Sequence, residues 1–253
     1  MSSTKRNTNH DSIASYYDLK GIEHHDLVVS CLEKLVFKHI PEGAHIFDLG
    51  CGSGQIAQRL LKRGYRVTGL DPSEGMLQRA RENAPDGEFI LDDARLFKLN
   101  ATFHLAISTD HVLNYLLYID ELKDALKNVY ESLLENGFFI FQLYIEELCE
   151  KNWARNDVGG GITDENVWTE IWSYDSENKI ARKYTANFQL INGTWQRSNG
   201  TFLLKPYSTI AVESALKEIG FTEITIYDPI KDFGLEDIPD TGSVFMCRKQ
   251  PNQ

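Results

Sequence analysis

The chain has 253 residues, of which 42% are hydrophobic and 25% are charged, a globular composition that excludes wholesale disorder, a fibrous repeat and a membrane bundle. Its 26 basic and 37 acidic residues give a net charge of -11, which argues against nucleic acid or a membrane surface as a partner. The four cysteines show no metal-ligand spacing, so we expect no metal site.

The beginning of the chain is polar. Residues 1–11 are predicted to be a disordered lead-in, with no signal sequence or membrane anchor, and we expect a cytoplasmic protein. From Ser12 to His39 the apolar residues recur at helical spacing, which predicts a mostly helical segment.

Strands and helices alternate after this segment. The apolar strand Ala44–Leu49 runs into a glycine-rich turn, and a helix follows that Gly64 is predicted to cap. Further strands are expected at Tyr65–Leu70, Glu88–Leu91, Phe103–Ser108 and Phe138–Tyr144, with helices at Glu74–Asn83 and at Ile119–Leu134, the last ended by Asn136-Gly137. The most apolar of these strands, Phe138–Tyr144, is typical of a parallel sheet that helices cover on both faces.

The alternation stops in the third quarter of the chain. Asn166 to Leu204 is rich in Trp, Tyr and Thr with polar alternation, which predicts an antiparallel meander with turns at Asp175–Asn178 and Asn192-Gly193. The final expected elements are a helix from Thr209 to Ile219 that Gly220 caps, and strands at Glu223–Tyr227 and Ser243–Arg248. We therefore expect an α/β domain at 12–150 and 205–250, interrupted by an inserted β lid at 151–204.

One pattern in the sequence is typical of a ligand-binding site. It consists of a strand, the run Asp48-Leu49-Gly50-Cys51-Gly52-Ser53-Gly54, a helix, a second strand and Asp71. Glycines permit a tight turn and close ligand approach, and the helix that follows directs free N–H groups at the ligand. An acid at the tip of the second strand is placed to bind a ribose diol. The pattern indicates a nucleoside-containing cofactor. The alternative is a purely structural turn, with Asp71 capping the next helix.

The spacing of the glycines separates two cofactor classes. A dinucleotide site requires G-x-G-x-x-G, whereas the sixth position here is Gln55. The run from Asp48 to Gly54 instead resembles motif I of class I S-adenosylmethionine-dependent methyltransferases, and the rest of the chain follows the order of that family. The resemblance implies a Rossmann-like, mostly parallel seven-stranded sheet with S-adenosylmethionine as cofactor.

The same resemblance implies cofactor contacts residue by residue. Asp71 matches the acid that binds both ribose hydroxyls, Asp93 matches the acid at the adenine amino group with Ala94 as its backbone partner, and Met76 matches a residue near the adenine. Tyr17 lies in an element typical of a branch whose N-terminal helix closes over the cofactor. The cofactor set expected is Tyr17, Asp48, Gly50, Cys51, Gly52, Asp71, Pro72, Met76, Asp92, Asp93, Ala94, Thr109 and Asp110.

The acceptor side is less defined by the sequence. The resemblance places the loop after the fourth strand beside the acceptor. The candidates for catalysis are Tyr17 and His111, the latter at a position where relatives commonly have a small residue. Candidates for substrate binding are His111, Asn114, Tyr115, Tyr144, Trp168 and Tyr207. The alternative interpretation is that His111 is an ordinary loop residue and that the aromatic rings form the core of the insert or a dimer contact.

The reaction expected is in-line displacement of the sulfonium methyl group, which needs alignment and exclusion of water and no protein nucleophile. The branch that this chain resembles includes glycine and aminosugar N-methyltransferases, so a small-molecule amine is the expected acceptor. Alternatives are a hydroxyl or carboxyl acceptor, a catalytically silent relative that binds the cofactor, and an NAD-dependent oxidoreductase. The chain is expected to be a monomer, or a homodimer through the inserted region.

Overall fold

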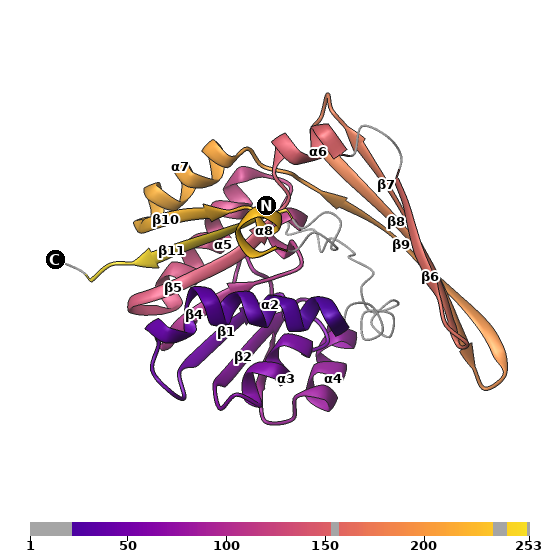
Figure 1. The fold of residues 1–253 in the computed structure, drawn as a ribbon, viewed down its shortest axis with the longest axis horizontal. Coiled ribbons are helices and arrows are strands. Elements are labelled where there is room, and N and C mark those ends of the chain that lie inside the picture. The colour runs from indigo at the N-terminus through magenta and orange to yellow at the C-terminus, as the bar shows by residue number, and fades with distance from the viewer. Residues whose placement is uncertain (1–21, 153–156, 235–241, 252–253) are drawn as a thin grey trace.

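The computed structural model describes residues 22–152, 157–234 and 242–251, and it contains two sheets. The first has seven strands in the order β10-β11-β5-β4-β1-β2-β3 (Figure 1). Its strands are β1 (His45–Leu49), β2 (Arg66–Asp71), β3 (Glu88–Leu91), β4 (Phe103–Ser108), β5 (Leu133–Leu143), β10 (Phe221–Tyr227) and β11 (Ser243–Lys249). All neighbouring pairs are parallel except those of β11, which runs antiparallel to β5 and β10. The mostly parallel α/β fold expected from the sequence is confirmed.

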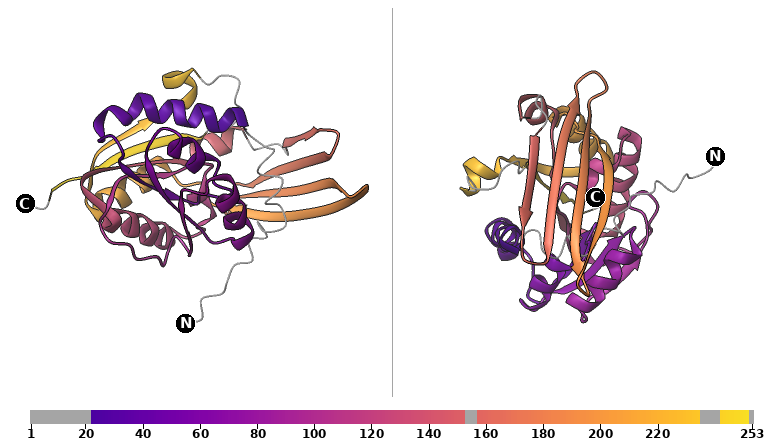
Figure 2. Two further views of the ribbon diagram at one scale, coloured as in Figure 1. Left: turned by 90° about the horizontal axis from the view of Figure 1, so that it is seen from below. Right: turned by 90° about the vertical axis from the view of Figure 1, so that its right-hand side faces the viewer.

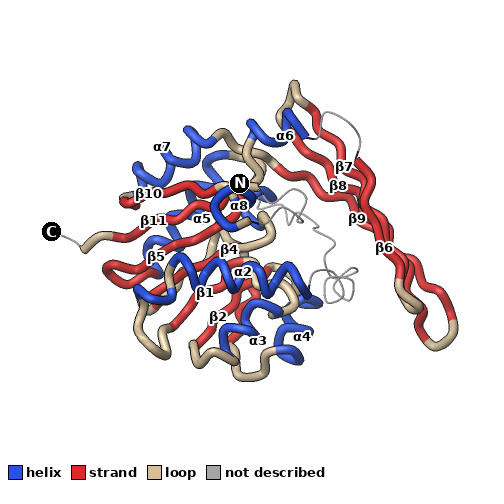
Figure 3. The backbone as a smooth tube through the Cα atoms, in the orientation of Figure 1, coloured by secondary structure: helices blue, strands red, loops and turns tan. Residues whose placement is uncertain are grey.

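Helices cover both faces of this sheet (Figure 3). They are α2 (Ile22–Leu35), α3 (Gln55–Leu61), α4 (Glu74–Asn83), α5 (Ile119–Ser132), α6 (Glu146–Asn152), α7 (Thr209–Ile219) and α8 (Pro229–Phe233), with 3-10 turns at Phe37–His39 and Val112–Tyr115. Two hydrophobic cores result, because successive strand residues point to opposite faces. In β1, Ile46 packs with apolar residues of α2 and α3, and Phe47 packs with those of α5 and α7. No helix of the described part is long and apolar enough to cross a membrane.

A second sheet stands to one side of the first (Figures 1 and 2). It is antiparallel, with the order β6-β7-β8-β9. Its strands are β6 (Asp157–Ile162), β7 (Asn166–Asp175), β8 (Ile180–Ile191) and β9 (Thr194–Leu204). Asn192 and Gly193 join β8 to β9 with φ of 50° and 76°, the left-handed backbone that a tight hairpin needs. The predicted antiparallel meander is therefore confirmed.

Two predicted helix ends were wrong. Helix α5 ends at Ser132 rather than at Asn136-Gly137, because Leu133 is fully buried and already pairs with Phe103 of β4. Helix α3 ends at Leu61, and Gly64, with φ of 85°, lies in the turn that follows it. Helices α6 and α8 and strand β6 were not predicted, since each is short and lacks a clear apolar period.

Candidate cofactor and acceptor site

The glycine-rich turn joins the carboxyl end of β1 to α3. Gly50 has φ of 78°, and a Cβ atom there would lie 2.4 Å from Val112 Cγ1. Gly52 has φ of 51°, but a Cβ atom there would meet no atom of the described residues within 4 Å, its chain neighbours aside. Gly50 is thus required by packing inside the protein, whereas the space beside Gly52 is open to a ligand. The side chain of Cys51 is buried, and burial raises the pKa of its thiol well above the ordinary value.

Asp71 lies at the carboxyl end of β2, next to this turn. Its Oδ2 accepts a hydrogen bond from Gly52 N at 3.0 Å, and its Oδ1 accepts one from Ser73 N at 2.9 Å. Ser73 in turn caps α4, accepting from Met76 N at 3.1 Å. The side chain of Asp71 is therefore held in one orientation. Each carboxylate oxygen can accept a further hydrogen bond, so the capping contacts leave capacity for ligand hydroxyls.

Asp48 is a buried acid in β1 that is 1% exposed. Neither of its carboxyl oxygens has a hydrogen-bond partner among the described residues. Burial, with the charges of Asp71 and Asp110, raises its pKa from 3.8 to about 7. An unpaired carboxyl group of this kind suits a cationic ligand, because a positive charge would stabilise its ionised form.

The segment after β3 contains Asp92 and Asp93, both predicted to bind the cofactor, the latter at the adenine. Asp92 Oδ1 accepts from Asp93 N at 2.7 Å, which fixes the turn. Asp93 pairs with Arg95, whose Nη2 lies 2.5 Å from Asp93 Oδ2 and whose Nε lies 2.8 Å from Oδ1. Arg95 also donates to Glu121 Oε1 of α5 at 2.8 Å. This ion pair, which the sequence did not predict, orients the Asp93 side chain.

Other predicted cofactor residues surround these acids. Met76 is 3% exposed and lies on the buried side of α4, Pro72 is exposed, and Ala94 accepts a hydrogen bond from Asn128 Nδ2 at 3.2 Å through its backbone oxygen. Tyr17, a candidate for both cofactor binding and catalysis, lies outside the described residues.

The loop after β4 has an unusual backbone. Asp110 and His111 are consecutive non-glycine residues in the left-handed region, with φ of 52° and 59°. Such conformations cost free energy and gather at functional sites. Thr109 immediately precedes them, and Gln142 Oε1 of β5 accepts from Asp110 N at 3.2 Å. His25 Nε2 of α2 lies 4.0 Å from Asp110 Oδ2, so this loop also meets the first described helix.

An aromatic stack connects this loop to the second sheet. The ring of His111, which is 6% exposed, stacks on Tyr144 with centroids 3.6 Å apart and an interplanar angle of 3°. Tyr144 meets the edge of Trp172 of β7 at 5.9 Å. The two sheets are therefore packed together at the residues proposed to face the acceptor.

Other candidate acceptor residues have structural contacts. Asn114 is fully buried, its Nδ2 donates to the backbone oxygens of Tyr144 and Lys205, and its Oδ1 accepts from Tyr144 N. The Tyr207 hydroxyl donates to the backbone oxygen of Leu116. Tyr115 packs edge-on against Phe202 of β9 at 6.1 Å, and Trp168 packs with the same cluster. These contacts favour a supporting role for Asn114 and Tyr207.

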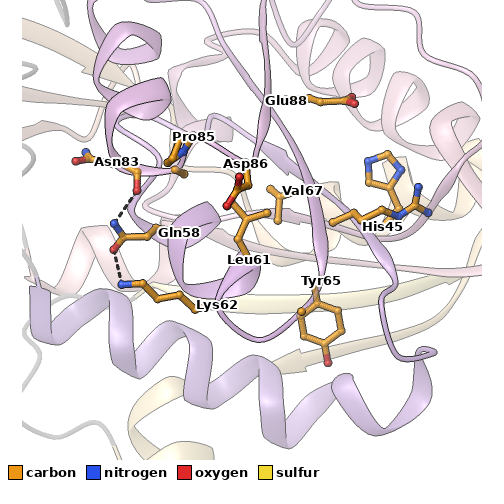
Figure 4. Close-up of a pocket in the computed structure, with 13 residues that line it drawn as sticks. His45, Gln58, Leu61, Lys62, Tyr65, Val67, Asn83, Pro85, Asp86 and Glu88 are labelled. Atoms are coloured by element: carbon orange, nitrogen blue, oxygen red, sulfur yellow. Dashed lines mark hydrogen bonds between the residues drawn. The ribbon is translucent and has the colours of Figure 1, made fainter.

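A hollow of about 570 Å³ lies elsewhere (Figure 4). Its lining includes His45 at the start of β1, Tyr65 and Arg66 at the start of β2, and Asp86 and Glu88 before and within β3. It therefore lies at the amino ends of these parallel strands, opposite the edge that carries the glycine turn. In parallel α/β sheets, ligands bind at the carboxyl ends of the strands, so this hollow is not the candidate site.

The chain is similar to known proteins over the same region. Residues 46–137 match the family model described as a methyltransferase domain. A protein of Geobacillus sp. (strain WCH70), named as a methyltransferase without a stated acceptor, is 28% identical over 86% of this chain and 90% of its own. The dTDP-3-amino-3,4,6-trideoxy-alpha-D-glucopyranose N,N-dimethyltransferase of Streptomyces venezuelae is 29% identical over 51% of this chain and 55% of its own.

The fold is also found in solved structures. The structure of CalS10 with S-adenosylmethionine bound, an amino pentose methyltransferase from Micromonospora echinaspora, aligns with a TM-score of 0.72 and 18% identity. The alignment covers 89% of this chain and 91% of that one.

Proposed function

We propose that the chain is a class I S-adenosylmethionine-dependent methyltransferase and that it transfers the methyl group to an amine nitrogen of a small molecule. The cofactor assignment rests on the turn at Gly52. The Gly52 N–H donates a hydrogen bond to Asp71 Oδ2 at 3.0 Å, and the space beside the Gly52 Cα holds no side chain of the described residues. The amine acceptor is supported by the aminosugar N,N-dimethyltransferase among the relatives.

The residues present fit this cofactor. We assign the ribose hydroxyls to Asp71, the adenine end to Asp93 with Met76, and the positively charged end to the neighbourhood of Asp48, whose two oxygens lack protein partners among the described residues. S-adenosylmethionine, when bound, supplies a methyl group on a sulfonium centre. The other assigned cofactor residues are Tyr17, Gly50, Cys51, Gly52, Pro72, Asp92, Ala94, Thr109 and Asp110.

Methyl transfer by in-line displacement asks the protein for alignment and for exclusion of water. We propose that the stacked rings of His111, Tyr144 and Trp172 form the apolar wall that keeps water from the acceptor nitrogen. The amine must reach the site without its proton, and His111 and Tyr17 are the residues that we propose to handle it. The carboxylates of Asp48, Asp71 and Asp110 favour a cationic cofactor at this edge.

The cofactor assignment is tested by calorimetric titration with S-adenosylmethionine, S-adenosylhomocysteine and, as a negative control, NADH. We expect the first two to bind and NADH not to bind. Asp71→Ala should weaken S-adenosylmethionine binding by about 1.5–3 kcal/mol, or roughly 10- to 150-fold, because charge-assisted hydrogen bonds are lost. Asp86→Ala is the matched control, because Asp86 lies at the amino ends of the parallel strands, away from the glycine turn. It should leave the affinity for S-adenosylmethionine unchanged. Equal affinities for both variants would reject the role of Asp71.

The acceptor class is tested by transfer of tritium from methyl-labelled S-adenosylmethionine to small amines, phenols and carboxylic acids in separate reactions. Labelled product with amines alone supports the proposal. Product only with phenols or acids would establish O-methylation instead. Cofactor binding without product in any arm would indicate a catalytically silent relative.

A further inference from the structure

One face of the four-stranded sheet packs against the rest of the molecule. We call it the inner face. It is defined by its contacts with Tyr144, which follows β5, and with Cys149 of α6. Its members are Trp168, Trp172, Tyr174, Ala181, Phe202 and Leu204. Strand alternation places residues 166 and 170 of β7, and 183, 185 and 187 of β8, on the same face.

Two asparagines and one threonine on this inner face have an oxygen for which the described residues provide no hydrogen-bond partner. Asn166, Thr185 and Asn187 are 5%, 3% and 3% exposed. Among the described residues, Asn166 Oδ1, Thr185 Oγ1 and Asn187 Oδ1 have no hydrogen-bond partner. Buried polar groups are nearly always paired, because an unsatisfied one destabilises the fold. Three such atoms on one sheet face indicate that something outside the described fold satisfies them.

The three side chains are close neighbours in the ladder. Thr185 and Asn187 are two residues apart in β8, and across the ladder they face Glu170 and Trp168. Asn166 pairs with Gln189, one step along the same face from Asn187. Side chains that are opposite or diagonal on one face lie within reach of a single bound molecule.

The chemistry of these atoms selects a ligand that donates hydrogen bonds. The amide Oδ1 of an asparagine only accepts, and a threonine hydroxyl can do both. Lys183, the nearest cation along β8, has its own contacts on the same face: its Nζ lies 5.3 Å from the Trp172 ring, 5.5 Å from the Phe202 ring and 4.0 Å from Glu170 Oε1. Ligand hydroxyl or ammonium groups would satisfy all three oxygens.

This face is continuous with the proposed site of methyl transfer. The Trp172 and Tyr144 rings meet with centroids 5.9 Å apart, and Tyr144 stacks on His111 with centroids 3.6 Å apart. His111 is followed in its loop by Val112, whose side chain packs over Gly50. A small acceptor that reaches from the cofactor turn would therefore extend along the inner face.

We propose that Asn166, Thr185 and Asn187 form an acceptor subsite that binds the hydroxyl groups of a polyhydroxylated amine. The proposal rests on the proposed function, since it assigns the part of the acceptor remote from the methylated nitrogen. It names three specificity-determining residues that lie on the second sheet rather than at the carboxyl edge of the first.

The test is a calorimetric titration of the full chain, loaded with S-adenosylhomocysteine, with three hexosamines (glucosamine, galactosamine and mannosamine) and with cyclohexylamine, a ring amine without hydroxyl groups. At least one hexosamine should bind ten-fold or more tightly than cyclohexylamine. Thr185→Val and Asn187→Leu should each weaken that binding by about 5- to 10-fold and leave the affinity for cyclohexylamine and for S-adenosylhomocysteine unchanged.

Thr201→Val is the matched control, because Thr201 lies on the exposed opposite face, across from Tyr184. It should not change any affinity. Thermal unfolding separates binding from a structural role: removal of an unpaired hydroxyl should leave the midpoint of Thr185→Val unchanged or higher. A large fall in that midpoint, no hexosamine binding, or equal binding of cyclohexylamine would overturn the subsite.

The two proposals fail in different ways. Hexosamine binding that depends on Thr185 and Asn187 but gives no methylated product would uphold the subsite and reject amine methylation. Methylation of cyclohexylamine as efficiently as of any hexosamine would uphold the reaction and reject the subsite.

Discussion

Asp48 and Asn114 are both buried polar residues, yet their surroundings differ. The carboxyl oxygens of Asp48 have no hydrogen-bond partner among the described residues, whereas the Asn114 amide makes three hydrogen bonds to backbone atoms. A group without protein partners, at the end of a strand that leads into the glycine turn, suits a ligand. A fully engaged group suits a scaffold. We therefore propose that Asp48 binds the cofactor, whereas the hydrogen bonds of Asn114 support Tyr144.

Asp48 should make the stability of the free protein depend on pH. Its folded pKa of about 7 lies above the ordinary value of 3.8, so the folded chain holds the proton more tightly than the unfolded chain. The free energy of unfolding should thus be greatest below about pH 4 and fall, by on the order of 4 kcal/mol, as the pH rises to about 7. Asp48→Asn should remove this part of the slope. Urea unfolding of both proteins between pH 4 and 8.5 checks it, and parallel curves would contradict the prediction.

Asn114→Ala should act on stability. It leaves two backbone oxygens and one backbone N–H without partners in the interior, which should lower the free energy of unfolding by about 2–4 kcal/mol. Asn100→Ala, at an exposed position, should change it by less than about 0.5 kcal/mol. Equilibrium denaturation measures both. A stable Asn114→Ala protein with lost turnover would restore the expectation that this residue binds substrate.

Among the elements, the two turns that flank α3 each contain a glycine with positive φ. Gly52 lies in the turn before the helix and Gly64 in the turn after it. Gly52→Ala and Gly64→Ala both place a side chain at positive φ, 51° and 85°, and the part of the chain that the structure describes has no atom beyond the chain neighbours within 4 Å of either new Cβ. Both should therefore lose a similar stability of about 1 kcal/mol. Only Gly52 borders the proposed cofactor, so Gly52→Ala should also weaken S-adenosylmethionine binding by ten-fold or more. Calorimetry on the two variants decides this, and equal binding would remove Gly52 from the site.

In the molecule as a whole, the second sheet packs against the cofactor-binding part through one small cluster that is rich in aromatic rings. Tyr144 and Tyr115 of the first part pack with Trp172, Trp168 and Phe202 of the second, while the two large cores of the seven-stranded sheet contain no residue from β6–β9. We propose that the segment 157–204 is a separate acceptor-binding unit inserted into the cofactor-binding domain.

Replacement of residues 157–204 by a short Gly–Ser linker should leave the first domain folded and able to bind S-adenosylmethionine, while methyl transfer falls below detection. Circular dichroism, calorimetry and the tritium assay measure the three properties. Loss of folding would show that the second sheet is part of the core of the first. Full-rate methyl transfer by the shortened chain would show that the segment has no role in the reaction.

Some features could be predicted from the amino-acid sequence alone. These are the helices and strands whose apolar residues recur with a clear period, and the glycine run with Asp71, whose spacing along the chain is fixed. Strands β3 and β4 and helices α4 and α7 have the predicted bounds, because the apolar period and the flanking turns are local properties of the chain. The glycine run and Asp71 were found for the same reason, since a βα turn brings residues near in sequence to one strand edge.

Only the tertiary structure decided which polar side chains are paired. Asn114, Asp93 and Asp48 were equal candidates in the sequence, but the partners of Asn114 lie 30 and 91 residues away and the second partner of Arg95 lies 26 residues away. The unpaired oxygens of Asn166, Thr185 and Asn187 likewise depend on which sheet face is buried. Burial and hydrogen bonding depend on contacts between distant segments, and these exist only once the sheets have formed.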